Sequence, residues 1–166
     1  METKIIERGQ VVLAGLSFFG DPFRSSAGWT EENEIGRVWK RFMAYCEHHP
    51  GRLQPACPGV LYELHVYHEE SKRMGEFEVF VGMPVDLPHD VPIELSLKTL
   101  PPATYAVFTL EGQQIVSDWP KLIDAWMADA GYHLAHPFHF QYYDERFKGL
   151  DRVAESQLDV YVPVKK

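Results

Sequence analysis

Residues 137–147 have the sequence PFHFQYYDERF, and residues 156–164 have the sequence SQLDVYVPV. Both segments are rich in aromatic and β-branched residues, a composition that is typical of strands, and a short polar spacer separates them. Gln141 places a neutral amide within the aromatic row of the first segment. A ligand site built on these strands is therefore expected to depend on Gln141.

Two helices are predicted upstream of these strands. The first is expected to begin at Thr30 as its N-cap and to end before Pro50–Gly51. Its apolar residues recur at helical spacing and comprise Ile35, Val38, Trp39, Phe42, Met43 and Cys46. The second is expected over residues 115–131, where Gly131 occupies the position of a C-cap glycine. Its apolar stripe comprises Trp119, Leu122, Ile123, Trp126, Met127 and Ala130.

Further strands are predicted at residues 4–18, 60–69, 75–83 and 94–110, the last entered through a double proline. The elements therefore follow the order strand, helix, strand, strand twice, over approximate pseudo-repeats 1–84 and 93–166. This order predicts a single α+β domain, residues 1–166, in which duplicated βαββ units form one antiparallel sheet. Both helices are expected on one face with a cleft between them, a common place for a ligand.

Composition limits the possible partners and the compartment. The formal net charge is −8 and no Lys/Arg cluster is present, which argues against direct binding of nucleic acid. The two cysteines, Cys46 and Cys57, give no disulfide or zinc pattern. The N-terminus lacks an apolar signal-peptide core, and no stretch is long enough to span a membrane. A cytoplasmic protein is expected, and its oligomeric state is left open.

The sequence contains no motif for metal, cofactor or covalent chemistry. None of the eight histidines pairs with a cysteine or carboxylate at a recognised ligand spacing. A nucleophile motif and a phosphate-binding glycine loop are both missing. We therefore predict no metal site, no cofactor and no catalytic residue.

The aromatic residues are the candidate binding groups, because an aromatic-lined cleft attracts flat or cationic ligands. Any single aromatic residue is more often part of a closed core, so core and cleft remain alternatives. The candidate ligand-binding residues are Trp39, Phe42, Tyr62, Tyr105, Phe140, Gln141, Tyr143 and Tyr161.

The chain also resembles the GyrI-like domain family, which is also called the AraC-type effector-binding domain. The resemblance rests on residues 12–16 (VLAGL), 35–42 (IGRVWKRF), 75–82 (GEFEVFVG), 100–108 (LPPATYAVF), 123–126 (IDAW), 130–132 (AGY), 140–147 (FQYYDERF) and 158–164 (LDVYVPV). It implies the duplicated βαββ fold and a cleft for drug-like, often cationic, aromatic molecules. In family regulators the domain is fused to a DNA-binding helix-turn-helix, whereas this chain is expected to be a stand-alone binding protein.

One departure from the family pattern concerns the charge in that cleft. The family often has a buried glutamate in the penultimate strand, where it meets a cationic ligand, and the matching residue here is Gln141. An amide offers hydrogen bonds but no charge, so a neutral ligand becomes more plausible. Strand alternation places Tyr62 and Leu64 on one face and Glu63 on the other. It therefore does not favour Glu63 or Glu78 as an inward-facing substitute.

Three functions follow from the residues and the resemblance. The first is binding of small hydrophobic or aromatic molecules, with cationic ones among them, and this is the leading hypothesis. The second is hydrolysis of cyclopropane-bearing toxins, which some stand-alone family members perform and which needs a titratable group in the cleft. The third is modulation of DNA gyrase, as described for some GyrI-like proteins.

Overall fold

The computed structural model describes all 166 residues and shows one large antiparallel sheet with two main helices. The strands are β1 (Glu2–Arg8), β2 (Val11–Gly20), β3 (Leu61–Val66), β4 (Phe77–Pro84), β5 (Ser96–Leu100), β6 (Ala103–Glu111), β7 (His133–Leu134), β8 (Phe138–Tyr143) and β9 (Gln157–Lys165). The helices are α1 (Glu34–His48), the single turn α2 (Ser71–Met74) and α3 (Trp119–Ala130), with 3₁₀ turns η1 (Pro88–Asp90), η2 (Gly112–Gln114) and η3 (Leu150–Glu155). None of the helices has the length and hydrophobicity that crossing a membrane requires.

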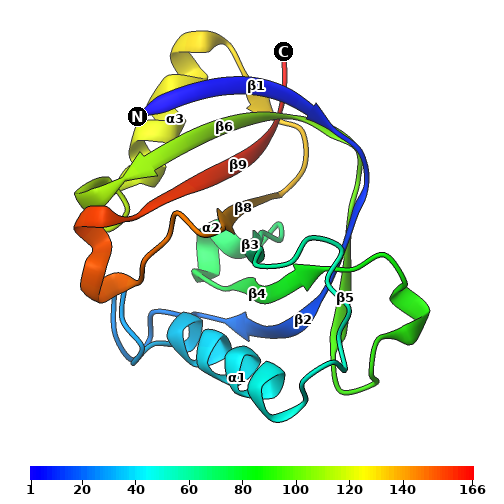
Figure 1. Ribbon diagram of the computed structural model, residues 1–166. Helices are drawn as coiled ribbons and strands as arrows, with labels where there is room; N and C mark the ends of the chain where they lie inside the picture. Colours follow the sequence, from blue (N-terminus) through cyan, green and yellow to red (C-terminus); the bar gives the residue numbers. More distant parts are fainter.

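The strand order in the sheet is β1-β6-β9-β8-β3-β4-β2-β5, and β7 pairs with β9. This order is mirrored about the central pair β8–β3, since β9 and β6 follow β8 on one side and β4 and β2 follow β3 on the other. The sheet curls strongly, so that β1 and β6 at one end bend over toward β2 and β5 at the other (Figure 1). The duplicated βαββ arrangement predicted from the element order is confirmed.

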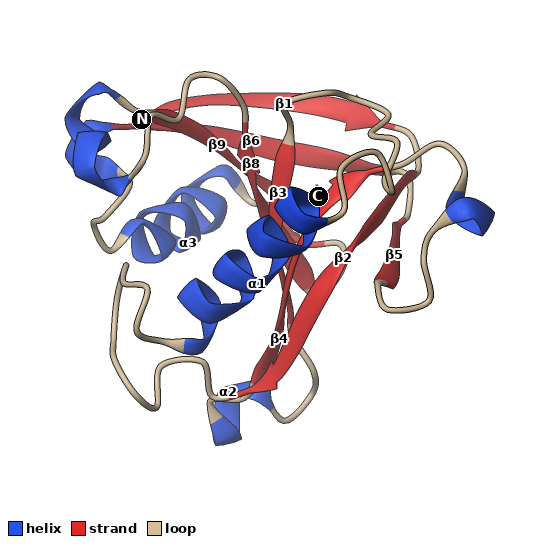
Figure 2. Cartoon of the chain, turned by 60° about the horizontal axis from the view of Figure 1, so that its bottom comes forward, coloured by secondary structure: helices blue, strands red, loops and turns tan.

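Helices α1 and α3 lie on the same face of the sheet (Figure 2). Val38 and Phe42 of α1 are fully buried and pack with Val81 of β4. Trp119 and Ile123 of α3 pack with residues of β6 and β9. The opposite, concave face of the sheet is also covered, by an aromatic and aliphatic core that includes Tyr62, Phe140 and Tyr161. The centre of the sheet is thus enclosed on both sides.

Several predicted boundaries were wrong, for local reasons. The strand expected over residues 4–18 is two strands, because the chain turns at Gly9–Gln10 and β1 pairs with β6 while β2 pairs with β4 and β5. The strand expected over residues 94–110 is likewise divided into β5 and β6 at Pro101–Pro102. Between the strands expected over residues 60–69 and 75–83, the chain forms the helical turn α2, which ends at Gly75 with a positive φ of 69°.

The start of α1 was also predicted too early. Its N-cap is Asn33, whose Oδ1 accepts a hydrogen bond from the backbone N–H of Gly36 at 3.0 Å. Thr30 instead stabilises a turn, since its Oγ1 accepts from the backbone N–H of Glu32. Helix α3 likewise begins at Trp119 rather than at residue 115, with Pro120 in its first turn. Its predicted C-cap glycine, Gly131, is confirmed by a φ of 68°.

Candidate functional site

A cleft of about 1260 Å³ lies between α1, the start of α3 and the centre of the sheet. This volume is large enough for a drug-sized molecule. Aromatic side chains from several elements line it, namely Phe23, Trp29, Trp39, Tyr67, Phe77, Trp119, Tyr143 and Phe147. The cleft therefore has the mainly apolar wall that is usual for small-molecule sites.

The outer wall of the cleft is formed by the loop before α1. Contacts made by Asn33 and Gly36 keep this loop close to the helix. Asn33 is fully buried, and its Nδ2 donates to the backbone carbonyl of Gly28 at 2.8 Å. Gly36 allows the loop to approach, because a Cβ there would lie 2.4 Å from the carbonyl oxygen of Thr30. These contacts place Trp29 and Thr30 against the cleft.

A buried carboxylate, Glu63 of β3, lies at the base of the cleft with 4% of its surface exposed. Its Oε1 accepts a hydrogen bond from Gln141 Nε2 at 3.0 Å, and its Oε2 accepts one from Trp39 Nε1 at 2.5 Å. Glu63 and Gln141 are directly paired across β3 and β8. The cleft therefore does contain an acid, on the strand next to the one that carries Gln141.

Tyr143 extends this network along β8. Its hydroxyl donates to Gln141 Oε1 at 2.8 Å, and its ring meets Trp39 edge to face at 4.9 Å between centroids. Burial, together with the nearby negative charge of Glu63, raises the pKa of Tyr143 well above its usual value. Tyr143 thus remains a neutral hydrogen-bond donor that fixes the Gln141 amide, whose NH₂ group then faces Glu63.

Two imidazoles lie beside the carboxylate. His65 Nε2 is 2.8 Å from Glu63 Oε1, and the rings of His65 and His139 are 4.9 Å apart. Burial, and then the neighbouring His65, hold the pKa of His139 well below its usual range. His139 Nε2 is buried and has no hydrogen-bond partner. No group of three or more His, Cys, Asp or Glu side chains is arranged to hold a metal ion.

The charge of the cleft wall is strongly negative. Five carboxylates line it, those of Glu31, Glu47, Glu63, Asp118 and Asp144, against one lysine, Lys40. Asp118 and Asp144 are paired with cations outside the lining, Lys121 and Arg146. Glu63 has no Lys or Arg partner, and its sole ion-pair contact is His65. A cation that enters the cleft would therefore meet a carboxylate that no Lys or Arg neutralises.

Three of the residues expected in the site lie on the cleft, namely Trp39, Gln141 and Tyr143. Phe42 is fully buried beneath α1. The other four, Tyr62, Tyr105, Phe140 and Tyr161, cluster on the opposite face of the sheet, where Phe140 and Tyr161 stack 4.7 Å apart. Strand alternation explains the division, because Gln141 and Tyr143 face the helices while Phe140 faces away from them.

The expectation that Glu63 would not face the cleft was wrong. Alternation correctly places Glu63 and His65 on one face of β3 and Tyr62 and Leu64 on the other, but the cleft lies on the face of Glu63. Glu78 is not on the cleft and pairs with Lys98 at 2.7 Å. The polar alternation of residues 60–69 was the available signal for Glu63 and His65. Trp119 was predicted only as part of the apolar stripe of the second helix, and no comparable signal marked Trp29 or His139.

The cluster on the opposite face surrounds a cation from the chain itself. Arg8 Nη2 donates to the Tyr62 hydroxyl at 3.0 Å. The Arg8 guanidinium carbon lies 5.1 Å from the Tyr161 ring centroid and 5.9 Å from that of Phe140. Arg8 has no carboxylate partner. The aromatic residues of this face therefore already hold a positive charge.

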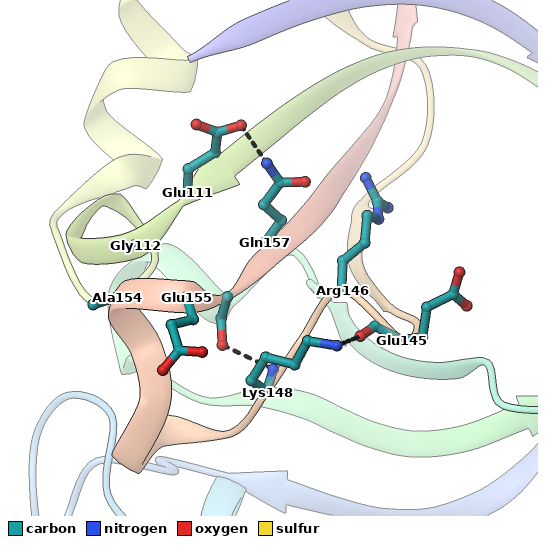
Figure 3. Close-up of a pocket in the computed structure, with 9 residues that line it drawn as sticks. Glu111, Gly112, Glu145, Arg146, Lys148, Ala154, Glu155 and Gln157 are labelled. Atoms are coloured by element: carbon teal, nitrogen blue, oxygen red, sulfur yellow. Dashed lines mark hydrogen bonds between the residues drawn. The ribbon is translucent and has the colours of Figure 1, made fainter.

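A second hollow, of about 380 Å³, lies beside η3 and the start of β9 (Figure 3). Its polar groups bind one another: Gln157 Nε2 donates to Glu111 Oε1, and Lys148 Nζ donates to the backbone carbonyl of Glu145. Arg146 is held by Asp144 and Asp159. With most of its polar groups already paired and one hydrophobic residue in its lining, this hollow is a poorer ligand site than the cleft.

Comparison with known proteins identifies relatives of the whole chain. The transcriptional regulator BrlR of Pseudomonas aeruginosa is 30% identical over 167 residues, which cover 99% of this chain and 56% of BrlR. The chain thus spans little more than half the length of this curated relative.

Two solved structures share the fold. SAV2435 bound to tetraphenylphosphonium has a TM-score of 0.63 and 14% identity, covering 99% of this chain and 94% of that one. EcmrR in its complex with DNA has a TM-score of 0.69 and 18% identity, covering 99% of this chain and 57% of that one.

The model of a protein family described as integron-associated effector binding protein matches residues 4–164. This match covers nearly the whole sheet and both main helices, and it agrees with the GyrI-like resemblance of the sequence motifs. The chain therefore belongs to the integron-associated effector binding protein family, a GyrI-like family.

Proposed function

We propose that the cleft binds small aromatic cations and that Glu63 provides the countercharge. The observation that carries this proposal is the buried Glu63 carboxylate, which has no Lys or Arg partner and lies among aromatic side chains. A buried ionised carboxylate is costly unless a cation compensates it. A bound cation would supply that compensation.

The aromatic wall supports the same class of ligand. Trp39, which donates to Glu63, and Tyr143, whose ring meets that of Trp39, both line the cleft, and Trp29 and Trp119 contribute further ring surface to it. Aromatic faces attract cations most strongly where water is excluded. The structural neighbour SAV2435 is bound to tetraphenylphosphonium, an aromatic cation without hydrogen-bonding groups. That compound is therefore a reasonable probe for this chain.

Fluorescence titration with tetraphenylphosphonium tests the proposal, because three of the four tryptophans line the cleft. The wild-type protein should show saturable quenching. The neutral compound triphenylphosphine oxide should bind more weakly. Glu63→Gln removes the charge with little change in shape and should weaken cation binding by roughly 10- to 100-fold, the usual size of a charged hydrogen bond or ion pair.

Glu78→Gln is the matched control, since Glu78 is a partly buried carboxylate on the adjacent strand β4 and lies outside the cleft. It should leave tetraphenylphosphonium affinity unchanged. Equal affinity for the cation in wild type and Glu63→Gln would disprove the role of Glu63. Absence of saturable binding would reject the aromatic cation as the ligand class.

Hydrolysis of a cyclopropane-bearing compound is a second candidate for the same cleft. It is favoured by the 2.8 Å contact between Glu63 and His65, because a carboxylate beside an imidazole can take a proton from water. Loss of such a compound can be followed by chromatography, with wild type, Glu63→Gln and buffer alone in parallel. Faster loss with wild type that Glu63→Gln abolishes would support catalysis, and a rate equal to that in buffer would exclude it for that compound.

A further inference from the structure

The contact between Glu63 and His65 affects whether the Glu63 carboxylate is available to pair with a cationic ligand. Glu63 has three hydrogen-bonding neighbours, and the Gln141 amide and the Trp39 indole are both permanently neutral. His65 is the one neighbour that can become positively charged, at 2.8 Å from Glu63 Oε1. Imidazole side chains change charge near neutral pH. The charge on His65 therefore determines whether the negative charge of Glu63 is already neutralised before a ligand binds.

His65 is surrounded by the Glu63 carboxylate and by aromatic and imidazole rings. Glu63 faces it from β3, His139 from β8 and the Phe77 ring from β4, at 5.2 Å between centroids. Tyr67 packs against both His139 and Phe77, and α3 contributes Trp119 to the same cluster. No Lys or Arg lies in this group. Burial holds the pKa of His139 well below its usual range, so His65, which contacts Glu63, is the imidazole of this group that can place a positive charge beside the carboxylate.

We propose that His65 is an internal counter-cation for Glu63, and that the cleft exchanges the proton on His65 for a cationic ligand. This inference rests on the proposed function of the cleft. When His65 is protonated, the pair is neutral overall and Glu63 has no free charge to offer. A ligand cation would then be the second positive charge at one carboxylate, and like charges repel strongly in a desolvated site.

Thermodynamic linkage fixes the sign of the effect. If a proton on His65 weakens the binding of a cation, then a bound cation must favour release of that proton by the same factor. Affinity for a permanent cation should therefore rise with pH through the range in which imidazole titrates. The slope should approach about ten-fold per pH unit at most, because one proton is exchanged for one ligand.

Isothermal titration calorimetry with tetraphenylphosphonium tests the proposal on the whole chain, since this ligand has no titratable group of its own. Affinity should increase by roughly 5- to 100-fold between about pH 5.5 and 8, a usual size for coupling between two sites. Below neutral pH, the measured heat should depend on the ionisation enthalpy of the buffer, which reports protons released on binding.

His65→Gln retains a donor for Glu63 but cannot carry a charge. In this variant the affinity should be nearly independent of pH over the same range, and proton release should disappear. The matched control is His133→Gln, because His133 is exposed on β7 and lies outside the cleft. It should show the same pH profile as the wild type.

The outcomes separate this inference from the proposed function. If tetraphenylphosphonium binds at no pH, the cationic ligand class fails and proton exchange fails with it. If it binds with pH-independent affinity, or if His65→Gln retains the wild-type profile, proton exchange is wrong while cation binding stands. Should His65→Gln fail to fold, the buffer dependence of the wild-type heat still decides the matter, because zero proton release overturns the proposal.

Discussion

Replacement of Arg8 by methionine should destabilise the protein without affecting the cleft. Methionine keeps the length and apolar character of the arginine stem but removes the guanidinium. The substitution therefore removes the hydrogen bond to Tyr62 and the contacts above Tyr161 and Phe140. It also leaves the Tyr62 hydroxyl, which belongs to a residue only 1% exposed, without a partner.

The expected cost follows from these contacts. A hydrogen bond to a charged group contributes about 1.5–3 kcal/mol, and the cation–π contacts contribute about 1 kcal/mol at a partly exposed site. Because Arg8 is half-buried, the lower part of the range applies and a loss of about 2–3 kcal/mol is expected. In a domain of this size each kcal/mol lowers the melting temperature by about 2–4 °C.

Urea unfolding followed by circular dichroism measures this change in the free energy of unfolding. Arg41→Met is the control, since Arg41 is exposed on α1 and forms no ion pair, and it should change stability by less than about 0.5 kcal/mol. Tetraphenylphosphonium affinity should be the same in Arg8→Met and wild type, because Arg8 lies on the opposite face of the sheet. A stability loss no larger than that of the control would refute the reasoning.

Three further perturbations test other parts of the structure. Gly36→Ala places a Cβ against the carbonyl of Thr30. It should lower the free energy of unfolding by about 1–3 kcal/mol and weaken the quenching of Trp29 fluorescence by the ligand. Wild-type stability together with wild-type quenching would contradict the close approach of the loop to Gly36. Burial raises the pKa of Tyr67 and of Tyr105 to about 12. These two phenols therefore ionise at lower pH in the unfolded chain than in the folded one, and the free energy of unfolding should fall from about pH 10 toward pH 12. The melting temperature measured against pH reports this loss, and a flat profile in that range would show that the phenols are not buried. The lowered pKa of His139 predicts that stability falls as pH drops below about 6.5, and that His139→Phe reduces this acid sensitivity; an unchanged acid limb would refute it.

The element order could be predicted from sequence because it depends on local patterns. Apolar residues at helical spacing identified both main helices, and alternating aromatic residues identified β8 and β9. Of the eight predicted ligand-binding residues, Trp39, Gln141 and Tyr143 lie on the cleft, whereas Tyr105, which was expected beside Gln141, lies on the opposite face of the sheet. The proposed modulation of DNA gyrase remains a prediction.

The acid of the cleft could not be predicted, because alternation states which residues share a face but not what covers that face. Residues 60–69 suggested an apolar inner face with Tyr62 and a polar outer face with Glu63. Helices α1 and α3 cover one face of the sheet, and its own curl encloses the other. The polar side of β3 faces the helices and forms the base of the cleft. The predicted start of α1 was wrong because it also depends on a tertiary contact. Thr30 and Asn33 are both good N-cap residues, and the contact of Gly36 with the preceding loop favours Asn33.

The placement of β1 and β5 has a consequence for how the chain can be divided. Strand β1 precedes the first βαββ unit yet pairs with β6 of the second, over Glu2–Arg8, while β5 precedes the second unit and pairs with β2 of the first. Each half thus lends its leading strand to the other, as in a reciprocal strand swap within one molecule. A protease cut in the linker at residues 85–95 would therefore yield two interlocked fragments held together without a covalent bond, rather than two independent domains.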